Sequence, residues 1–92
     1  MSTRFIIEDE SHAELRSEHS TFAEAVEELK RLSAIPWDQP PNTAPCMSWK
    51  TCGRNYEIIE YETSNEPWRQ IRRVPAFEIN AKGVTWDPDF QI

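Results

Sequence analysis

Residues 21–34, TFAEAVEELKRLSA, carry the strongest structural pattern in the chain. Their apolar residues follow the spacing i, i+3, i+4, i+7 and i+10 of a single helical face: Phe22, Ala25, Val26, Leu29 and Leu32. Thr21 can cap the helix N-terminus, and Glu24 three positions later completes a capping box. Pro36 ends the helix, because the residue before a proline is disfavoured in the α conformation. The spacing therefore predicts one amphipathic helix with one buried face.

Two short strands are predicted before this helix. Residues 4–9, RFIIED, alternate so that Phe5 and Ile7 share one face of a strand. Residues 13–19 are a weaker candidate for the second strand of a hairpin, because Leu15 is the one good core residue among them. We expect this second strand to lie at an edge of the sheet, where a mostly polar sequence is tolerated.

Residues 54–63, RNYEIIEYET, predict a strand with apolar side chains on both faces. Tyr56 and Ile58 point to one side of this strand, and Ile59 and Tyr61 point to the other. A strand with this pattern is typical of the interior of a sheet, or of a sheet whose second face is covered by another segment.

The last third of the chain predicts two further strands. Residues 68–80 read as a strand broken at Pro75, because a proline cannot donate a hydrogen bond to a neighbouring strand and so marks a bulge or an edge. Residues 84–86 predict a short last strand after a turn at 81–83. Residues 87–92 are expected to form a frayed tail.

Together these elements predict a single α+β domain over residues 1–92. The order hairpin, helix, long loop, hairpin favours a two-layer domain, in which one main helix packs on one face of a mostly antiparallel sheet of four or five strands. In architecture, this order and the strand sequence YEIIE at 56–60 resemble many small bacterial domains, and the resemblance transfers no catalytic residue. One helix covers about half of such a sheet, so the other face needs a cover, either the long loop or a second copy of the chain.

Residues 36–53, PWDQPPNTAPCMSWKTCG, show neither a helical nor a strand period. Connections of this length are usually functional or disordered, and we expect an ordered loop because tryptophan and cysteine prefer burial. Tryptophan is enriched at the centres of protein interfaces, although it also fills cores. The predicted interaction surface consists of this loop and one further tryptophan: Pro36, Trp37, Pro40, Pro41, Trp49 and Trp68.

Composition limits the classes of function. The chain has 92 residues, of which 38% are hydrophobic, and a formal net charge of −6. A nucleic-acid binder usually needs a positive field, and a membrane span needs about 18 consecutive apolar residues. The first residues carry no signal-peptide pattern, so we expect a cytoplasmic protein without membrane contact. With two glycines the chain can form neither a P-loop nor a dinucleotide fingerprint, and we expect no cofactor and no catalytic residue.

Cys46 and Cys52 offer an alternative, thiol-based function. With His12 and His19 they would complete a set of two cysteines and two histidines for zinc, but the spacing matches no common zinc motif. A disulfide and an activated thiol are further alternatives, since neighbouring basic residues can lower the pKa of a thiol. We expect two reduced thiols and no bound metal.

A basic and aromatic strip is the alternative binding surface. With Trp68 and Tyr56 beside them, its basic side chains could contact single-stranded nucleic acid by charge and stacking. The basic residues of this strip are Lys50, Arg54, Arg69, Arg72 and Arg73. The competing interpretation, which we favour, pairs these arginines with Glu57, Glu60 or Glu62 on a neighbouring strand. The sequence therefore predicts a non-enzymatic binding or regulatory module that contacts another protein, with homodimerisation as one form of that contact.

Overall fold

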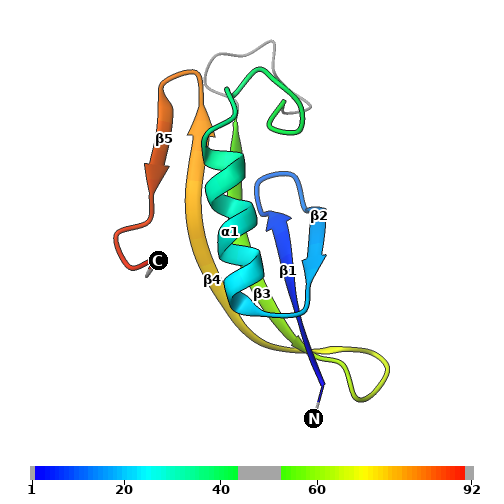
Figure 1. The fold of residues 1–92 in the computed structure, drawn as a ribbon. Coiled ribbons are helices and arrows are strands. Elements are labelled where there is room, and N and C mark those ends of the chain that lie inside the picture. The colour runs from blue at the N-terminus through cyan, green and yellow to red at the C-terminus, as the bar shows by residue number, and fades with distance from the viewer. Residues whose placement is uncertain (1, 44–52, 91–92) are drawn as a thin grey trace.

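The computed structural model describes residues 2–43 and 53–90. In this described part of the chain, the helix lies along one face of a sheet (Figure 1). The elements in chain order are β1 (Thr3–Asp9), β2 (Glu14–His19), α1 (Phe22–Ser33), β3 (Arg54–Glu62), β4 (Arg69–Asn80) and β5 (Gly83–Trp86). Within these two described ranges, no helix has the length and apolar character needed to cross a membrane.

The five strands form one sheet in the order β2–β1–β3–β4–β5, and every neighbouring pair is antiparallel. β3 lies in the centre, as its apolar side chains on both faces predicted. β2 lies at an edge, as its polar sequence predicted. The structure therefore confirms a small α+β domain, with a five-stranded antiparallel sheet and one helix on one face.

α1 begins at the predicted capping box. Thr21 Oγ1 accepts a hydrogen bond from the backbone N–H of Glu24 at 3.1 Å, and Glu24 Oε1 accepts one from the backbone N–H of Thr21 at 3.2 Å. These bonds satisfy N–H groups that have no partner within the helix. The helix ends at Ser33, shortly before Pro36, as the proline predicted.

The core lies between α1 and the sheet face that the helix covers. Its buried apolar side chains come from the helix, from the strands β1, β3 and β4 and from the C-terminal segment: Phe5, Ile7, Ala25, Val26, Leu29, Leu32, Tyr56, Ile58, Ala76, Phe77, Ile79 and Phe90. Removal of this apolar surface from water is the main stabilising contribution to the fold. Trp37 and Trp86 pack against this cluster, so these two tryptophans serve the core.

β4 continues through Pro75, whereas the sequence predicted a break there. The predicted irregularity is present, because the register of β3 against β4 shifts between Tyr56 and Glu57, next to the proline. β5 pairs with β4 only over residues 77–80. Pro75 therefore lies on a part of β4 that has a single neighbouring strand, where a missing N–H is tolerated.

Residues 87–90 pack against the sheet, in place of the frayed end expected for them. The backbone N–H of Asp87 donates to the carbonyl of Ala76 at 2.7 Å. Phe90 is 9% exposed, and its ring centroid lies 5.4 Å from that of Trp86. Residues 91–92 lie outside the described part of the chain.

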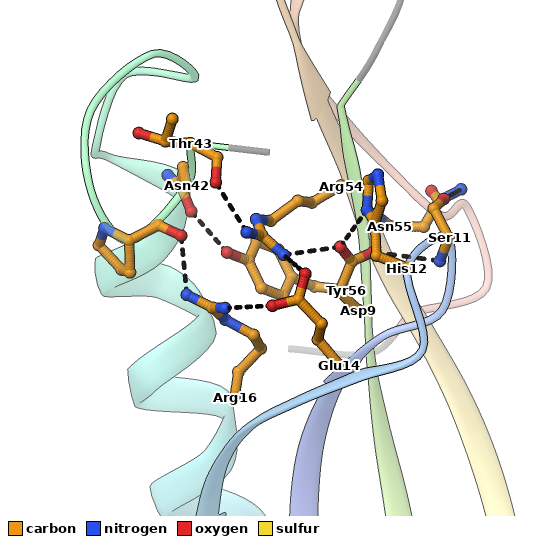
Figure 2. A network of polar contacts seen from close by, with 11 residues as sticks. Asp9, Ser11, His12, Glu14, Arg16, Asn42, Thr43, Arg54, Asn55 and Tyr56 are labelled. Atoms are coloured by element: carbon orange, nitrogen blue, oxygen red, sulfur yellow. Dashed lines mark hydrogen bonds and ion pairs between the residues drawn. The ribbon is translucent and has the colours of Figure 1, made fainter. Parts of the chain in front are cut away.

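We call the sheet face opposite α1 the open face. Strand alternation and register place these side chains on it: Arg4, Ile6, Glu8, Leu15, Glu18, Asn55, Glu57, Ile59, Tyr61, Arg73, Pro75, Glu78 and Thr85. No helix or strand of the described residues covers this face. Residues 36–43, the described part of the long loop, pack on the helix side: Trp37 contacts the core, and Asn42 bonds to the end of the helix (Asn42 is labelled in Figure 2). They therefore do not provide the expected cover.

Candidate functional site

The structure separates the residues of the predicted interaction surface. Four of them follow α1 in the chain: Pro36, Trp37, Pro40 and Pro41. Trp68 precedes β4, at the opposite end of the sheet from the loop that follows α1 (Figure 1). Trp68 is 37% exposed, and its ring lies 6.0 Å from that of Tyr61. Trp49 lies outside the described residues, and the described members do not form one continuous surface.

The predicted pairing of arginines with acidic residues on the neighbouring strand is confirmed for two arginines. Arg72 Nε donates to Glu60 Oε1 at 2.7 Å, and its guanidinium lies 5.0 Å from the ring centroid of Phe22. Arg73 forms an ion pair with Glu57 on the open face. Because Arg72 lies on the helix side of the sheet and Arg73 on the open face, the two do not belong to one strip.

The other basic residues are dispersed as well. Arg54 is 4% exposed and forms part of a buried network, so it is not a surface residue. Arg69 is exposed at the start of β4. Lys50 lies outside the described residues.

Cys46 and Cys52 also lie outside the described residues, so the thiol and zinc interpretations stay predictions. The two histidines are described: His12 lies in the turn before β2, and His19 is the last residue of β2. His12 Nδ1 lies 2.6 Å from Asp9 Oδ2. His19 is separated from it by the length of the strand, so the structure does not bring the histidines together.

A buried polar network joins the ends of β1 and β3 on the helix side of the sheet (Figure 2). Asp9 is fully buried at its centre. Asp9 Oδ1 accepts hydrogen bonds from the backbone N–H groups of Ser11 at 3.1 Å and Asn55 at 3.0 Å. Asp9 Oδ2 accepts from Arg54 at 2.8 Å and contacts His12. Full use of both carboxylate oxygens compensates for the burial of this charge.

Arg54 connects this network to the loop after α1. Its guanidinium donates to Glu14 Oε1 at 3.2 Å and to the carbonyl of Thr43 at 2.7 Å. Two buried atoms at this junction, Arg54 Nε and Thr43 Oγ1, have no hydrogen-bond partner. The arginine thus holds the β1–β2 turn, β3 and the loop together.

Asn42 completes the connection to the helix. Its Nδ2 donates to the carbonyls of Leu32 and Ile35, each at 2.8 Å, which satisfies acceptors at the helix C-terminus. Its Oδ1 accepts from the Tyr56 hydroxyl at 2.8 Å. Burial raises the pKa of Tyr56, which keeps this hydroxyl protonated as a donor.

Asp9, His12 and Glu14 each place one possible metal-ligand atom within 4.8 Å of the others. However, the guanidinium of Arg54 already contacts both carboxylates of this group. Arg54 and Arg16, which also contacts Glu14, therefore balance the two carboxylates, and a metal ion would have to displace a guanidinium. We assign the network a structural role.

A pocket of about 280 Å³ lies on the open face, where β3 and β4 meet the segment after β5. Four of its lining residues are acidic: Glu10, Glu57, Glu78 and Asp87. No lysine or arginine lines it, and Pro75 and Pro88 contribute apolar surface. The pocket therefore presents a concentrated negative charge to any ligand on this face.

Glu57 is the most enclosed of these acids, with 1% of its surface exposed. Its Oε1 pairs with Arg73, whereas its buried Oε2 has no hydrogen-bond partner. Burial raises the pKa of Glu57 to about 7; the Arg73 guanidinium opposes this rise, and the charges of Glu10, Glu8 and Asp9 add to it. An acid with one unsatisfied oxygen and a pKa near neutrality is a candidate functional group.

The buried network also supports this pocket from the other side of the sheet. Asp9 holds the backbone N–H of Asn55, and the N–H of Glu10 donates to the Asn55 carbonyl at 2.9 Å. Asn55 and Glu10 both line the pocket. The Asp9–Arg54 pair therefore positions one wall of the acidic pocket.

Sequence reasoning identified Glu57 as a partner for an arginine but missed its place in a pocket. One signal was present, since Glu57 lies between Tyr56 and Ile58 in a strand predicted to be interior, where a carboxylate is easily buried. Asp87 and Glu10 had no such signal, because the tertiary fold brings them to β3.

Comparison with protein-family models, curated proteins and solved structures finds no match for this chain.

Proposed function

We propose that this chain is a small non-enzymatic module that binds another protein through the open face of its sheet. The observation that carries the proposal is the one-sided construction of the domain. α1 covers one face, and no helix or strand of the described residues covers the other. A sheet face without a covering layer, with the exposed Leu15 at its edge and charged side chains across it, is a candidate interaction site.

The open face carries side chains suited to protein contact. Leu15 is 65% exposed at the β2 edge, and Trp68 is 37% exposed beside Tyr61. Between them, Ile6 and Ile59 pair across β1 and β3 in the middle of the face, but they are 2% and 0% exposed, so a partner would contact the side chains around them. Aromatic and aliphatic groups surrounded by charged side chains are typical of the centre and rim of an interface.

The charge of the open face indicates the kind of partner. Its two arginines already pair with glutamates on the same face, Arg4 with Glu18 and Arg73 with Glu57. The remaining charge comes from glutamates and is negative. We therefore expect a partner that presents a basic segment, since complementary charge speeds and orients association.

Site-specific photocross-linking in cells tests this proposal. A photoreactive amino acid in place of Leu15 is expected to form an adduct with one partner, whereas the same amino acid in place of Glu27 on the outer side of α1 is not. The partner is then identified by mass spectrometry and produced for binding measurements. Leu15→Asp is expected to weaken its binding by about tenfold or more, and Glu27→Gln is expected to leave binding unchanged.

Three results would contradict the proposal. Equal adducts from both positions would show non-specific contact, and the absence of adducts at Leu15 would show that this part of the face is free in the cell. An adduct with a second copy of this chain would make the open face a dimer interface and would exclude its use for a different protein.

A further inference from the structure

We infer that the acidic pocket around Glu57 binds the guanidinium or ammonium group of a basic side chain of the partner. This inference rests on the proposed function and names the group by which the partner is anchored. It assigns Glu57 to the floor of the pocket and Glu10, Glu78 and Asp87 to its rim.

The burial of the four acids supports this arrangement. Glu57 is 1% exposed, whereas Glu10 and Glu78 are exposed. Oε2 of Glu57 accepts no hydrogen bond in the folded chain. A buried acceptor without a donor is unfavourable, so a donor that enters the pocket gains both this bond and the charge of the rim. Because Oε2 is buried, the inference requires the Glu57 side chain to turn toward the pocket when the donor enters.

An organic cation fits this pocket better than a metal ion. Among the described residues, three possible ligand atoms gather within 4.8 Å of one another only at Asp9, His12 and Glu14, on the helix side of the sheet. The pocket acids are therefore spread out, which suits a guanidinium or ammonium group on a carbon stem. Pro75 and Pro88 can pack against such a stem.

The existing contact of Arg73 supports the same chemistry. Its guanidinium already pairs with Oε1 of Glu57 from the open face. One carboxylate can accept hydrogen bonds on both oxygens. Arg73 therefore neutralises one side of Glu57 and leaves Oε2 and the three rim acids for a second cation.

The test is an NMR titration of the full chain, labelled with ¹⁵N, at pH 7.5 and constant ionic strength. The probes are arginine amide and lysine amide, each acetylated at the α-amino group, with the equivalent citrulline compound as a neutral control. Both cationic probes are expected to shift the backbone amides of Glu57, Glu78 and Thr85 in a saturable manner, and citrulline is expected to shift none of them. A calcium chloride titration tests the inorganic cation.

Substitutions then locate the binding group. Glu57→Gln keeps the shape of the side chain and is expected to weaken probe binding by about tenfold. Glu78→Gln, at the exposed rim, is expected to weaken it by about twofold to threefold without disturbing the fold. Glu27→Gln on α1 is the matched control and is expected to change nothing.

The inference is overturned if the cationic probes cause no saturable shifts, if Glu57→Gln and Glu27→Gln give the same affinity, or if calcium binds at the pocket and the organic cations do not. These results are distinct from failure of the proposed function. A partner captured through Leu15 whose binding is unchanged by Glu57→Gln would support the open face and reject the pocket. Probe binding without any cross-linked partner would support cation binding in the acidic pocket and reject the proposed protein-binding function.

Discussion

At Glu57, one side chain links the stability of the fold to pH. Burial raises its pKa from 4.5 to about 7 in the folded chain. Between these two values the folded state holds a proton that the unfolded state has released. The free energy of unfolding therefore decreases as pH rises through this window, because the folded chain must then either keep the proton or bury a charge.

Glu57→Gln is expected to remove this pH dependence. In the native chain, the contribution of Glu57 to the free energy of unfolding should decrease by roughly 1–3 kcal/mol between pH 5 and pH 8. Urea unfolding at several pH values measures this slope, and Glu27→Gln serves as the control. A variant at position 57 that keeps the native slope would show that another group titrates.

Arg54 illustrates the opposite case of a buried charge that is paired with opposite charges, the carboxylates of Asp9 and Glu14. In Arg54→Met, Asp9 keeps its charge in a buried site but loses the guanidinium, so the free energy of unfolding is expected to decrease by roughly 3–5 kcal/mol. Arg31→Met, which removes an exposed pair with Glu28, is expected to have little effect.

The double variant Asp9→Asn, Arg54→Met provides the check on this explanation. It removes both charges, so it should recover part of the stability that Arg54→Met loses. Urea unfolding of the four chains measures the coupling. A double variant less stable than the sum of both single changes would contradict a charge-based explanation.

At the scale of the element, α1 depends on its N-terminal cap. Thr21→Ala removes the acceptor for the Glu24 N–H and is expected to lower the free energy of unfolding by about 1 kcal/mol. Thr21→Ser keeps the hydroxyl and is expected to retain most of the stability. Thermal and urea unfolding followed by circular dichroism measure both variants; equal loss in the two would show that the threonine methyl group, not the cap, matters.

The elements also show where local sequence patterns are sufficient. The helix, the edge strand β2 and the central strand β3 follow from periodicity and capping, which involve residues close together in the chain. The packing of residues 87–90 does not, because it depends on the hydrogen bond from Asp87 to Ala76 on β4 and on the place of Phe90 in the core. The continuation of β4 through Pro75 does not follow from local patterns either. Pro75 is tolerated because β4 has a single neighbouring strand there, and this is a property of the whole sheet.

At the scale of the whole molecule, stability should decrease from the centre of the sheet to its edges. β3 has neighbours on both sides over its length, whereas β5 has four residues and one neighbour. We expect the slowest amide hydrogen exchange in β3 and β1 and the fastest strand exchange in β5. Exchange measured by NMR at low protein concentration tests this order, and protection of β5 equal to that of β3 would contradict it.

The division of the molecule into a covered and an open face also separates its charges. Arg72 and Arg73 are adjacent in sequence, yet one contacts Phe22 at the start of α1 and the other pairs with Glu57 on the open face. A linear basic strip therefore cannot form from them. The acidic pocket, in contrast, collects Glu10, Glu57, Glu78 and Asp87 from distant segments.

Local order in the sequence was sufficient to predict the α+β class, the capped helix, the strands and the pairing of Arg72 and Arg73 with glutamates, because each depends on alternation, helical spacing or a short turn. The acidic pocket, the unpartnered oxygen of Glu57 and the buried Asp9–Arg54 pair depend on the sheet order and on the burial that packing creates. Asp9 and Arg54 are 45 positions apart in the chain, yet their side chains lie 2.8 Å apart. Charge and solvent exposure at such sites are properties of neighbours that meet only when the strands pair, so they follow from the tertiary fold.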